Sequence, residues 1–148
     1  MKMKLDELLA SLEPIALAEA DYLYVAESFL PQAGKGLFTA IRIYAGEIVA
    51  VFEGELLTDD EANLCRKANK DGYFIQLLNG QILDSMHTHC LAKYANDAAG
   101  SPVLKVRNNA VIALNEQQQI CIVATRNIRA GEEVYVSYGK AYWAEKSN

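Results

Sequence analysis

Three side chains that commonly ligate metals lie within four residues of one another near the middle of this 148-residue chain. They belong to His87, His89 and Cys90, and ligands at i and i+2 of a strand point to one face. A tetrahedral site needs a fourth group, and the sequence contains no second cluster that would supply it. We therefore interpret this stretch as a loop with two solvated histidines and predict no metal site.

Acidic residues form two further groups. Asp59, Asp60 and Glu61 stand where the first turn of a helix is expected, and acids there complement the partial positive charge of a helix N-terminus. Glu132 and Glu133 are interpreted as a turn before a strand, although this pair could also attract a basic substrate.

The composition predicts one soluble globular domain. Hydrophobic residues make up 51% and charged residues 22% of the chain, and no apolar run is long enough for a membrane helix. The net charge of −5 argues against a broad nucleic-acid surface and favours a basic peptide or protein as the partner. Cys65, Cys90 and Cys121 are an odd number at wide spacings, which fits a reducing compartment.

The first residues carry no pattern of a cleaved signal. They read MKMKLDELLA, and Asp6 and Glu7 interrupt the apolar stretch that a signal peptide needs. We expect a cytoplasmic or nuclear location, with non-classical export into a host left open. The oligomeric state is left open as well.

Hydrophobic spacing predicts mostly strands with a few short helices. Apolar residues from Leu5 to Leu12 recur at helical spacing, and Pro14 ends that segment. The stretch 58–70 begins with Thr58 and Glu61 at capping-box spacing, which predicts a helix. Segments rich in β-branched and aromatic residues predict strands over 21–28, 36–43, 47–57 and 131–138.

Two hairpins and one long loop complete the second half of the chain. The first hairpin joins 73–78 to 81–85 through Asn79-Gly80, and the second joins 109–115 to 119–126 through Glu116 and Gln117. Residues 86–109 between them show little periodicity, and a loop of this length in a compact domain is more often functional than idle.

Several blocks of sequence, taken in order, resemble the SET domain. GKGLFTAIRIYAGEIVAVFEGELL (34–57) resembles its opening, with Gly-x-Gly-Leu-Phe, a glycine-glutamate turn and a strand ending in Gly-Glu; RNIRAGEEVYVSYGKAYW (126–143) resembles its close. Between them, Asp84 stands as in the family's Ile-Asp-Ala, and KYANDAAG with NNAVI is similar to Arg-Phe-Ile-Asn-His-Ser-Cys-x-Pro-Asn. These blocks together span roughly 70% of the chain, which one short motif matched by chance would not do.

The resemblance implies a protein-lysine N-methyltransferase that uses S-adenosyl-L-methionine. It implies a mainly β (α+β) fold of several small twisted sheets, with a C-terminal strand threaded under a preceding loop. Residues 1–20 would form an amphipathic helix and extension, and residues 21–148 the SET-like domain. The partner would be a lysine-containing protein or peptide, histone tails being the family's commonest target, with no nucleic acid or membrane bound directly.

The resemblance also assigns roles to individual residues. Asn96 would bind the amino-acid end of the cofactor and the backbone after it the adenine edge, while Trp143 would lie across the adenine. The cofactor-binding positions are Gly34, Lys35, Gly36, Leu37, Asn96, Asp97, Tyr138 and Trp143. Each has a simpler alternative: the glycines a plain turn, Asn96 an Asx turn, and Trp143 a hydrophobic plug over the last strand.

Two tyrosines are assigned to catalysis. Tyr138 would hold and orient the attacking lysine amine by hydrogen bonding, and Tyr73 would line the substrate channel; packing of both rings is the alternative. Val136, two residues before Tyr138, would also line the channel. Because valine is smaller than the family's tyrosine or phenylalanine there, we predict di- or trimethylated product.

The sequence departs from the family pattern directly after Asn96. Asp97 replaces the usual histidine, and Ala98 and Ala99 replace serine and cysteine. The closing asparagine of the motif is Asn109 or Asn108. The departure at Asp97 supports an alternative function, a catalytically inactive SET-like module that binds a basic peptide or the cofactor without turnover.

Overall fold

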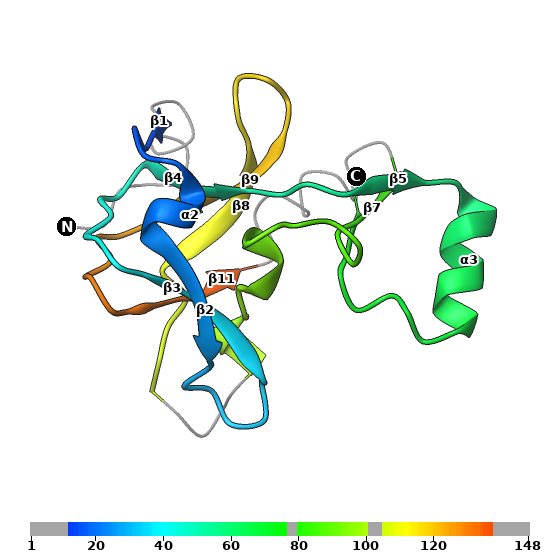
Figure 1. Ribbon diagram of the computed structural model, residues 1–148, viewed down its shortest axis with the longest axis horizontal. Helices are drawn as coiled ribbons and strands as arrows, with labels where there is room; N and C mark the ends of the chain where they lie inside the picture. Colours follow the sequence, from blue (N-terminus) through cyan, green and yellow to red (C-terminus); the bar gives the residue numbers. More distant parts are fainter. Residues whose placement is uncertain (1–11, 77–79, 101–104, 138–148) are drawn as a thin grey trace.

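Three small β-sheets and a few short helices make up the protein (Figure 1). The computed structural model describes residues 12–76, 80–100 and 105–137. The five-stranded sheet has the order β1 (Glu13–Pro14), β4 (Glu47–Val51), β9 (Ile120–Ala124), β8 (Ala110–Leu114) and β11 (Val136–Ser137). The second sheet has the order β10 (Glu133–Val134), β3 (Lys35–Thr39) and β2 (Leu23–Glu27); the third has β5 (Glu55–Leu57), β7 (Ile82–Asp84) and β6 (Phe74–Gln76).

The helices are short and lie at the margins of the sheets. They are α2 (Glu19–Tyr22), α3 (Asp59–Lys67) and the 3-10 turns η1 (Ala92–Tyr94) and η2 (Ala98–Gly100). In Figure 1, α3 and the β5–β7 region project to one side of the body formed by the other two sheets. Over the ranges described, no helix is both long and apolar enough to cross a membrane. The predicted helix ending at Leu12 falls almost wholly on residues 1–11, outside the described residues.

Local sequence signals account for the elements that were predicted best. The side chain of Thr58 accepts the Glu61 N–H, and the Glu61 carboxylate accepts the Thr58 N–H, so the capping box at α3 is confirmed. Hydrogen bonding of the Glu61 carboxylate to Thr58, to its backbone N–H first, lowers the pKa of Glu61. The strand pairing of both predicted hairpins is confirmed, since β6 pairs with β7 and β8 with β9, each antiparallel. Asn79 of the predicted Asn79-Gly80 turn lies outside the described residues.

Two segments predicted as single strands are divided. Residues 47–57 form β4 and β5, which belong to different sheets, and residues 131–138 contain β10 and β11, which also pair in different sheets. The turn of the second hairpin is longer than predicted, because Gln118 joins Glu116 and Gln117 in it with a left-handed φ of 63°. Each divided segment changes partner: β4 pairs with β9 and β5 with β7, and β10 pairs with β3 and β11 with β8.

The last described residues, 133–137, form what we call the C-terminal segment, which runs between two other stretches of chain. On one edge the Val136 N–H donates to the carbonyl of Asn96 (2.8 Å). On the other, the Tyr135 carbonyl accepts the N–H groups of Asn109 (2.9 Å) and Ala110 (3.0 Å), and β11 pairs in parallel with β8. Because Asn96 and Asn109 flank the 97–108 loop, the segment passes under that loop, and the predicted threading is confirmed.

One main hydrophobic core joins the sheets. Its buried side chains come from every sheet, Ile75 on β6 among them, and the fully buried ones include Leu37 on β3, Ile122 on β9 and Val136 on β11. Residues 12–22 belong to the same body, since β1 pairs in parallel with β4 and Tyr22 donates to the Val49 carbonyl (2.7 Å). Burial raises the pKa of Tyr22.

Gly54 occupies the break between β4 and β5, and we predict that it tolerates no side chain. A Cβ there would collide with the carbonyl oxygen of Asp84 and lie 2.7 Å from its carbonyl carbon. Gly54→Ala is expected to lower the free energy of unfolding by about 1–3 kcal/mol, measured by urea denaturation. Gly72→Ala is the matched control, because a Cβ at Gly72 meets nothing within 4 Å; equal stability of the two variants would contradict this account.

Candidate functional site

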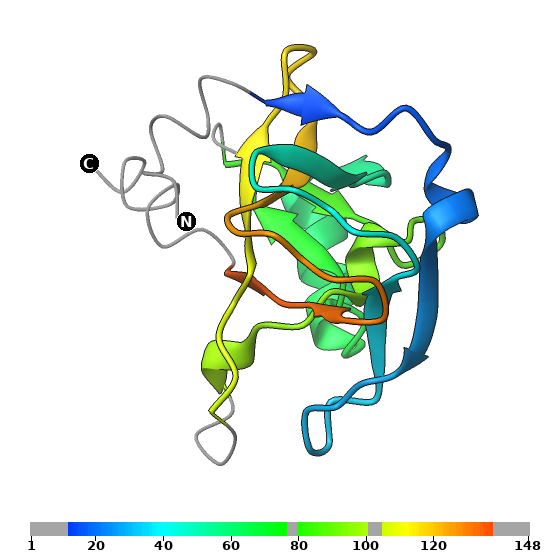
Figure 2. The same ribbon diagram turned by 90° about the vertical axis from the view of Figure 1, so that its left-hand side faces the viewer.

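Three segments far apart in sequence meet at one end of the molecule. Figure 2 shows the β2–β3 hairpin tip and the described parts of the 97–108 loop projecting from this end, below the strands of the C-terminal segment. The hairpin tip is closed by a hydrogen bond from the Ser28 N–H to the Gly34 carbonyl (2.8 Å), and Gly34 has a left-handed φ of 71°. Glycine adopts this φ without steric cost, which explains its place at the turn.

Asn96 joins all three segments. Its Nδ2 donates to the carbonyl of Lys35 (3.0 Å) and to Oε2 of Glu133 (3.4 Å), and its backbone carbonyl accepts from Val136. No described residue donates to its Oδ1. The side chain is partly exposed, so Oδ1 is an acceptor available to a ligand.

Asp97 has a structural partner. Its Oδ1 accepts from Asn108 Nδ2 (2.8 Å) and from the Ala99 N–H (2.9 Å), while Oδ1 of Asn108 accepts the Ala98 N–H (2.8 Å). These bonds tie the two ends of the 97–108 loop together. The residue that departs from the expected histidine therefore closes the loop under which the C-terminal segment passes.

Asn109 is fully buried and grips the C-terminal segment. Its Nδ2 donates to the Glu133 carbonyl (3.0 Å), and its Oδ1 accepts the Tyr135 N–H (2.9 Å). An asparagine amide thus pairs with backbone in the way that a neighbouring strand would. The two candidates for the closing asparagine have separate tasks, Asn108 at the loop and Asn109 at the strand.

Glu133 lies inside the protein, and the idea that it attracts a basic substrate is wrong. It is 2% exposed, and its carboxylate accepts from Ser28 Oγ (2.6 Å) and the Phe29 N–H (2.8 Å). Glu132 remains at the surface, where it pairs with Arg129 (3.3 Å). The GEE motif contained Glu133, but only the fold showed that its side chain turns inward.

Gly36 is required beside Glu133. A Cβ at Gly36 would collide with Glu133 Oε2 and lie 3.2 Å from the Ser28 Cβ. The absence of a side chain was expected to let the backbone approach a ligand; in the structure it makes room for this carboxylate. Lys35 and Leu37 flank Gly36, with Lys35 exposed and Leu37 fully buried in the core.

Apolar contacts hold the loops around Tyr135. Leu30 and Ala33 of the hairpin tip pack with Tyr135 and with Ala98 and Val106 of the 97–108 loop. Burial raises the pKa of Tyr135, and the Glu133 carboxylate acts in the same direction. An apolar cluster around Tyr135 therefore connects the hairpin tip, the 97–108 loop and the C-terminal segment near Asn96.

Tyr73 meets a second aromatic residue that the sequence reasoning missed. The rings of Tyr73 and Tyr94 are 6.3 Å apart and nearly perpendicular, and Tyr73 is half-buried. The ammonium of Lys93 lies 5.1 Å from the Tyr73 ring and 5.4 Å from the Tyr94 ring. Tyr94 could have been found from the resemblance, because it stands two residues before Asn96.

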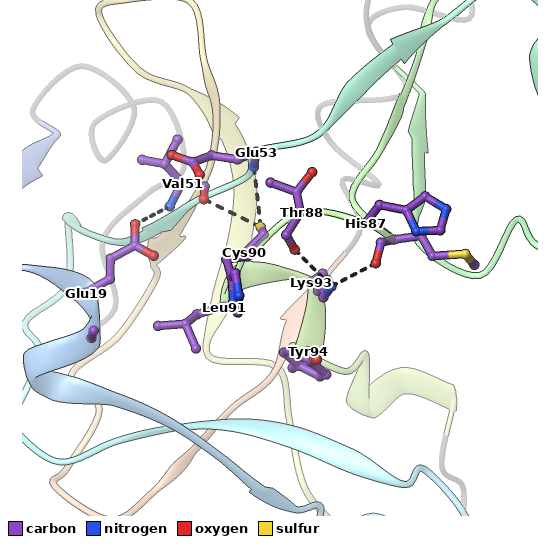
Figure 3. A pocket seen from close by; sticks show the side chains of 12 residues that line it. Glu19, Val51, Glu53, His87, Thr88, Cys90, Leu91, Lys93 and Tyr94 are labelled. Atoms are coloured by element: carbon purple, nitrogen blue, oxygen red, sulfur yellow. Dashed lines mark hydrogen bonds between the residues drawn. The ribbon is translucent and has the colours of Figure 1, made fainter.

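A pocket of about 640 Å³ opens beside Tyr94 (Figure 3). Lys93 forms part of its wall and is held by three backbone carbonyls, those of Ser85 (3.1 Å), Met86 (3.3 Å) and Thr88 (3.1 Å). Glu19 and Glu53 supply carboxylates from the opposite side. Burial raises the pKa of Glu19, and the nearby Glu53 carboxylate raises it further. The hydrogen bond from the Val51 N–H to Oε2 of Glu19 (2.9 Å) lowers this pKa and so opposes the effect of burial.

The histidines and cysteines of the central loop do not converge. His87 and His89 are exposed at the rim of this pocket, whereas Cys90 is buried and its thiol accepts the Glu53 N–H (3.3 Å). Among the residues described, no three potential ligands are grouped for a metal ion. Cys121 is also buried, and burial raises the pKa of its thiol to about 12, so it carries no reactive thiolate at neutral pH.

Of the remaining predicted site residues, the structure describes only Val136. Val136 is fully buried in the main core, with its N–H bound to Asn96. Tyr138 and Trp143 lie outside the described residues. The structure thus brings Gly34, Lys35, Gly36, Asn96 and Asp97 to one end of the molecule, and it pairs Tyr73 with Tyr94 near the adjoining pocket.

Comparison with known proteins identifies relatives. The family model described as "SET domain" matches residues 34–139. Over 130 residues the chain is 30% identical to Histone-lysine N-methyltransferase EZH2 of Chaetomium thermophilum (strain DSM 1495 / CBS 144.50 / IMI 039719), an alignment covering 81% of this chain and 8% of that protein. The chain therefore spans less than a tenth of this curated relative's length.

Solved structures show the same fold. The chain matches the crystal structure of an active polycomb repressive complex 2 in the basal state with a TM-score of 0.66 and 31% identity, covering 80% of this chain and 15% of that chain. It matches ctPRC2 in an autoinhibited conformation bound to S-adenosylmethionine with a TM-score of 0.66 and 29% identity, covering 85% and 16%. The fold class predicted from the sequence is confirmed.

We predict that the Asn109 amide is essential to stability. Asn109→Ala leaves the buried Glu133 carbonyl and Tyr135 N–H without their side-chain partner, and the free energy of unfolding should fall by about 3 kcal/mol. Asn127→Ala is the control, because the Asn127 Oδ1 accepts one exposed hydrogen bond, from the Ala45 N–H. Urea denaturation measures both variants, and similar losses in the two would show that the grip on the C-terminal segment contributes little.

Proposed function

Since the chain belongs to the SET-domain family, we propose that it is a protein-lysine N-methyltransferase that uses S-adenosyl-L-methionine. The observation that carries the proposal is the junction at Asn96. One amide there has its nitrogen bound by the protein and its oxygen available, at the point where the Gly34–Gly36 stretch and the C-terminal segment meet.

The residues present fit an amino-acid group at this junction. The ammonium of such a group needs hydrogen-bond acceptors, and Asn96 Oδ1 is an acceptor without a donor among the described residues. The Lys35 carbonyl beside it already accepts from Asn96 and keeps the amide in place. When bound, the cofactor supplies a methyl group on a sulfonium, which is an electrophile. The chain has to bind and align the two reactants, and we assign binding to Gly34, Lys35, Gly36, Asn96 and Asp97. Leu37 is fully buried in the core and supports this stretch from the inside.

Tyr73 and Tyr94 are the residues that we assign to the substrate lysine. Their rings offer apolar faces to an aliphatic side chain and favour a cation at its end, and the Lys93 ammonium beside both rings is an internal example of that preference. The hydroxyl of Tyr138 would orient the amine toward the sulfonium methyl for in-line displacement. Trp143 keeps the role predicted for it, the adenine contact. Val136 is fully buried in the main core, so we propose that it acts behind the channel wall, not in it.

A basic protein segment is the proposed substrate. The net charge of −5 and the carboxylates of Glu19 and Glu53 in the pocket beside Tyr94 favour a positively charged partner. The relative is named a histone-lysine methyltransferase, so a histone tail is the first substrate to test, and a chromatin location would follow. This chain spans a small part of that relative. The substrate and the location are therefore proposals that rest on the charge of the chain and on its similarity to that part.

The contacts of Asp97 favour the enzyme over the inactive binding module. The histidine of the family pattern is missing, but the carboxylate in its place closes the 97–108 loop through Asn108. The loop keeps Asn96 in position without the histidine. This supports a working cofactor site, and turnover remains the property to measure.

Ligand-induced stabilisation and methyl transfer together test the proposal. S-adenosylmethionine or S-adenosylhomocysteine at 100 times its dissociation constant should stabilise the fold by about 2.7 kcal/mol, seen as a rise in Tm, and adenosine serves as the control ligand. Labelled cofactor with core histones or cell lysate, followed by mass spectrometry, should give modified lysines with two or three methyl groups. No shift at millimolar cofactor rejects the enzyme, whereas a shift without transfer indicates the binding module.

Removal of one hydroxyl tests the role of Tyr138. Tyr138→Phe should reduce methyl transfer at least tenfold, about 1.4 kcal/mol of transition-state stabilisation, and leave cofactor affinity nearly unchanged. Tyr44→Phe is the matched control, since Tyr44 is 54% exposed and lies on the β3–β4 connection. Full activity in the Tyr138 variant would remove this hydroxyl from the mechanism.

A further inference from the structure

The carboxylate of Glu133 is buried among neutral hydrogen-bond donors. Oε2 accepts from Ser28 Oγ (2.6 Å) and Asn96 Nδ2 (3.4 Å), and Oε1 accepts from the Phe29 N–H (2.8 Å). Within the described part of the chain it forms no ion pair with a lysine or arginine. Burying an acidic side chain that is 2% exposed, with no cationic partner among the described residues, is costly, and this cost indicates a specific role.

The contacts of Glu133 determine which way the Asn96 amide points. An asparagine amide can turn by 180°, which exchanges its donor nitrogen and its acceptor oxygen. Here the nitrogen faces two acceptors, the Lys35 carbonyl and Glu133 Oε2. The reversed amide would set its oxygen against both of them and lose two hydrogen bonds. Asn96 Oδ1 is therefore held on the side away from Glu133.

We propose that Glu133 is a positioning residue for recognition of the cofactor's amino-acid end: by holding Asn96 Nδ2, it presents Oδ1 to the cofactor's ammonium. This inference rests on the proposed function and adds a residue to it. Glu133 touches neither reactant and acts only through Asn96. Its effect is limited to ligands that carry an ammonium, which distinguishes it from a residue that merely stabilises the fold.

The neighbouring residues are arranged around this contact. Gly36 carries no Cβ, and one there would collide with Glu133 Oε2. Ser28 Oγ donates to Oε2 and also accepts the Leu30 N–H (3.1 Å), so the hairpin tip holds the carboxylate from the other side. The hairpin tip and the Asn96 amide thus hold the carboxylate from two sides.

Glu133→Gln is the decisive substitution because it preserves shape and removes one acceptor. The new NH₂ group takes the Oε2 position, where the Ser28 hydroxyl can accept from it, because at the Oε1 position it would face the Phe29 N–H, which only donates. At Oε2 it sets a donor against Asn96 Nδ2. Glu132→Gln is the matched control at the adjacent residue, whose carboxylate binds Arg129 at the surface.

Two ligands separate positioning from stability. S-adenosylhomocysteine has the amino-acid end, and 5′-methylthioadenosine lacks it. By isothermal titration calorimetry, Glu133→Gln should raise the Kd for S-adenosylhomocysteine about tenfold and the Kd for 5′-methylthioadenosine less than twofold. Glu132→Gln should change neither. Asn96→Ala should show the same ligand dependence, and Glu133→Gln added to it should cause no further loss.

The other results with Glu133→Gln and with the wild-type protein overturn the inference, and Ser28→Ala provides the test if Glu133→Gln does not fold. An unchanged Kd for S-adenosylhomocysteine in Glu133→Gln, or equal losses for both ligands, rejects positioning through Asn96 and leaves the proposed function standing. If the wild-type protein binds neither ligand, the proposed function fails and this inference fails with it. If Glu133→Gln does not fold, Ser28→Ala replaces it: the same ligand dependence with a two- to threefold loss supports the inference, and no ligand dependence overturns it.

Discussion

The burial of the C-terminal segment between Asn96 and Asn109 is the constraint on which the rest of the structure depends. Its backbone is hydrogen-bonded on both edges, by the Asn96 carbonyl on one side and by Asn109 and Ala110 on the other. The Asn109 amide adds a donor and an acceptor where the sheet offers none. Since buried peptide groups must find partners, this insertion also fixes where the 97–108 loop and β8 can lie.

The same insertion places a carboxylate at the centre of the candidate site. Glu133 leaves β10 pointing inward and reaches the hairpin tip through Ser28 and Phe29, and Asn96 through its amide. A glycine at position 36 is the steric condition for this arrangement. Motif glycines are commonly explained by the approach of a ligand, and here the approach of another side chain is at least as important.

The departure at Asp97 illustrates how a site survives the loss of a motif residue. The carboxylate makes two local hydrogen bonds, to Asn108 and to the Ala99 N–H, which hold the loop in the required course. Its partner is Asn108, one of two adjacent asparagines that the sequence does not distinguish. The chain matches only a small part of relatives that are far longer. The function proposed for it therefore depends on the geometry of its own loop and not on the activity of those whole proteins.

The sequence by itself determined the family, the mainly β fold class, the capping box at Thr58 and both hairpins. These features depend on motif order or on contacts between residues close together in the chain, so spacing and residue type suffice to predict them. The tertiary structure alone decided that 47–57 is two strands, that Tyr94 meets Tyr73, and that Glu133 is buried. Those outcomes depend on partners distant in sequence, such as Ser28 and Glu133, 105 residues apart, which no local pattern encodes.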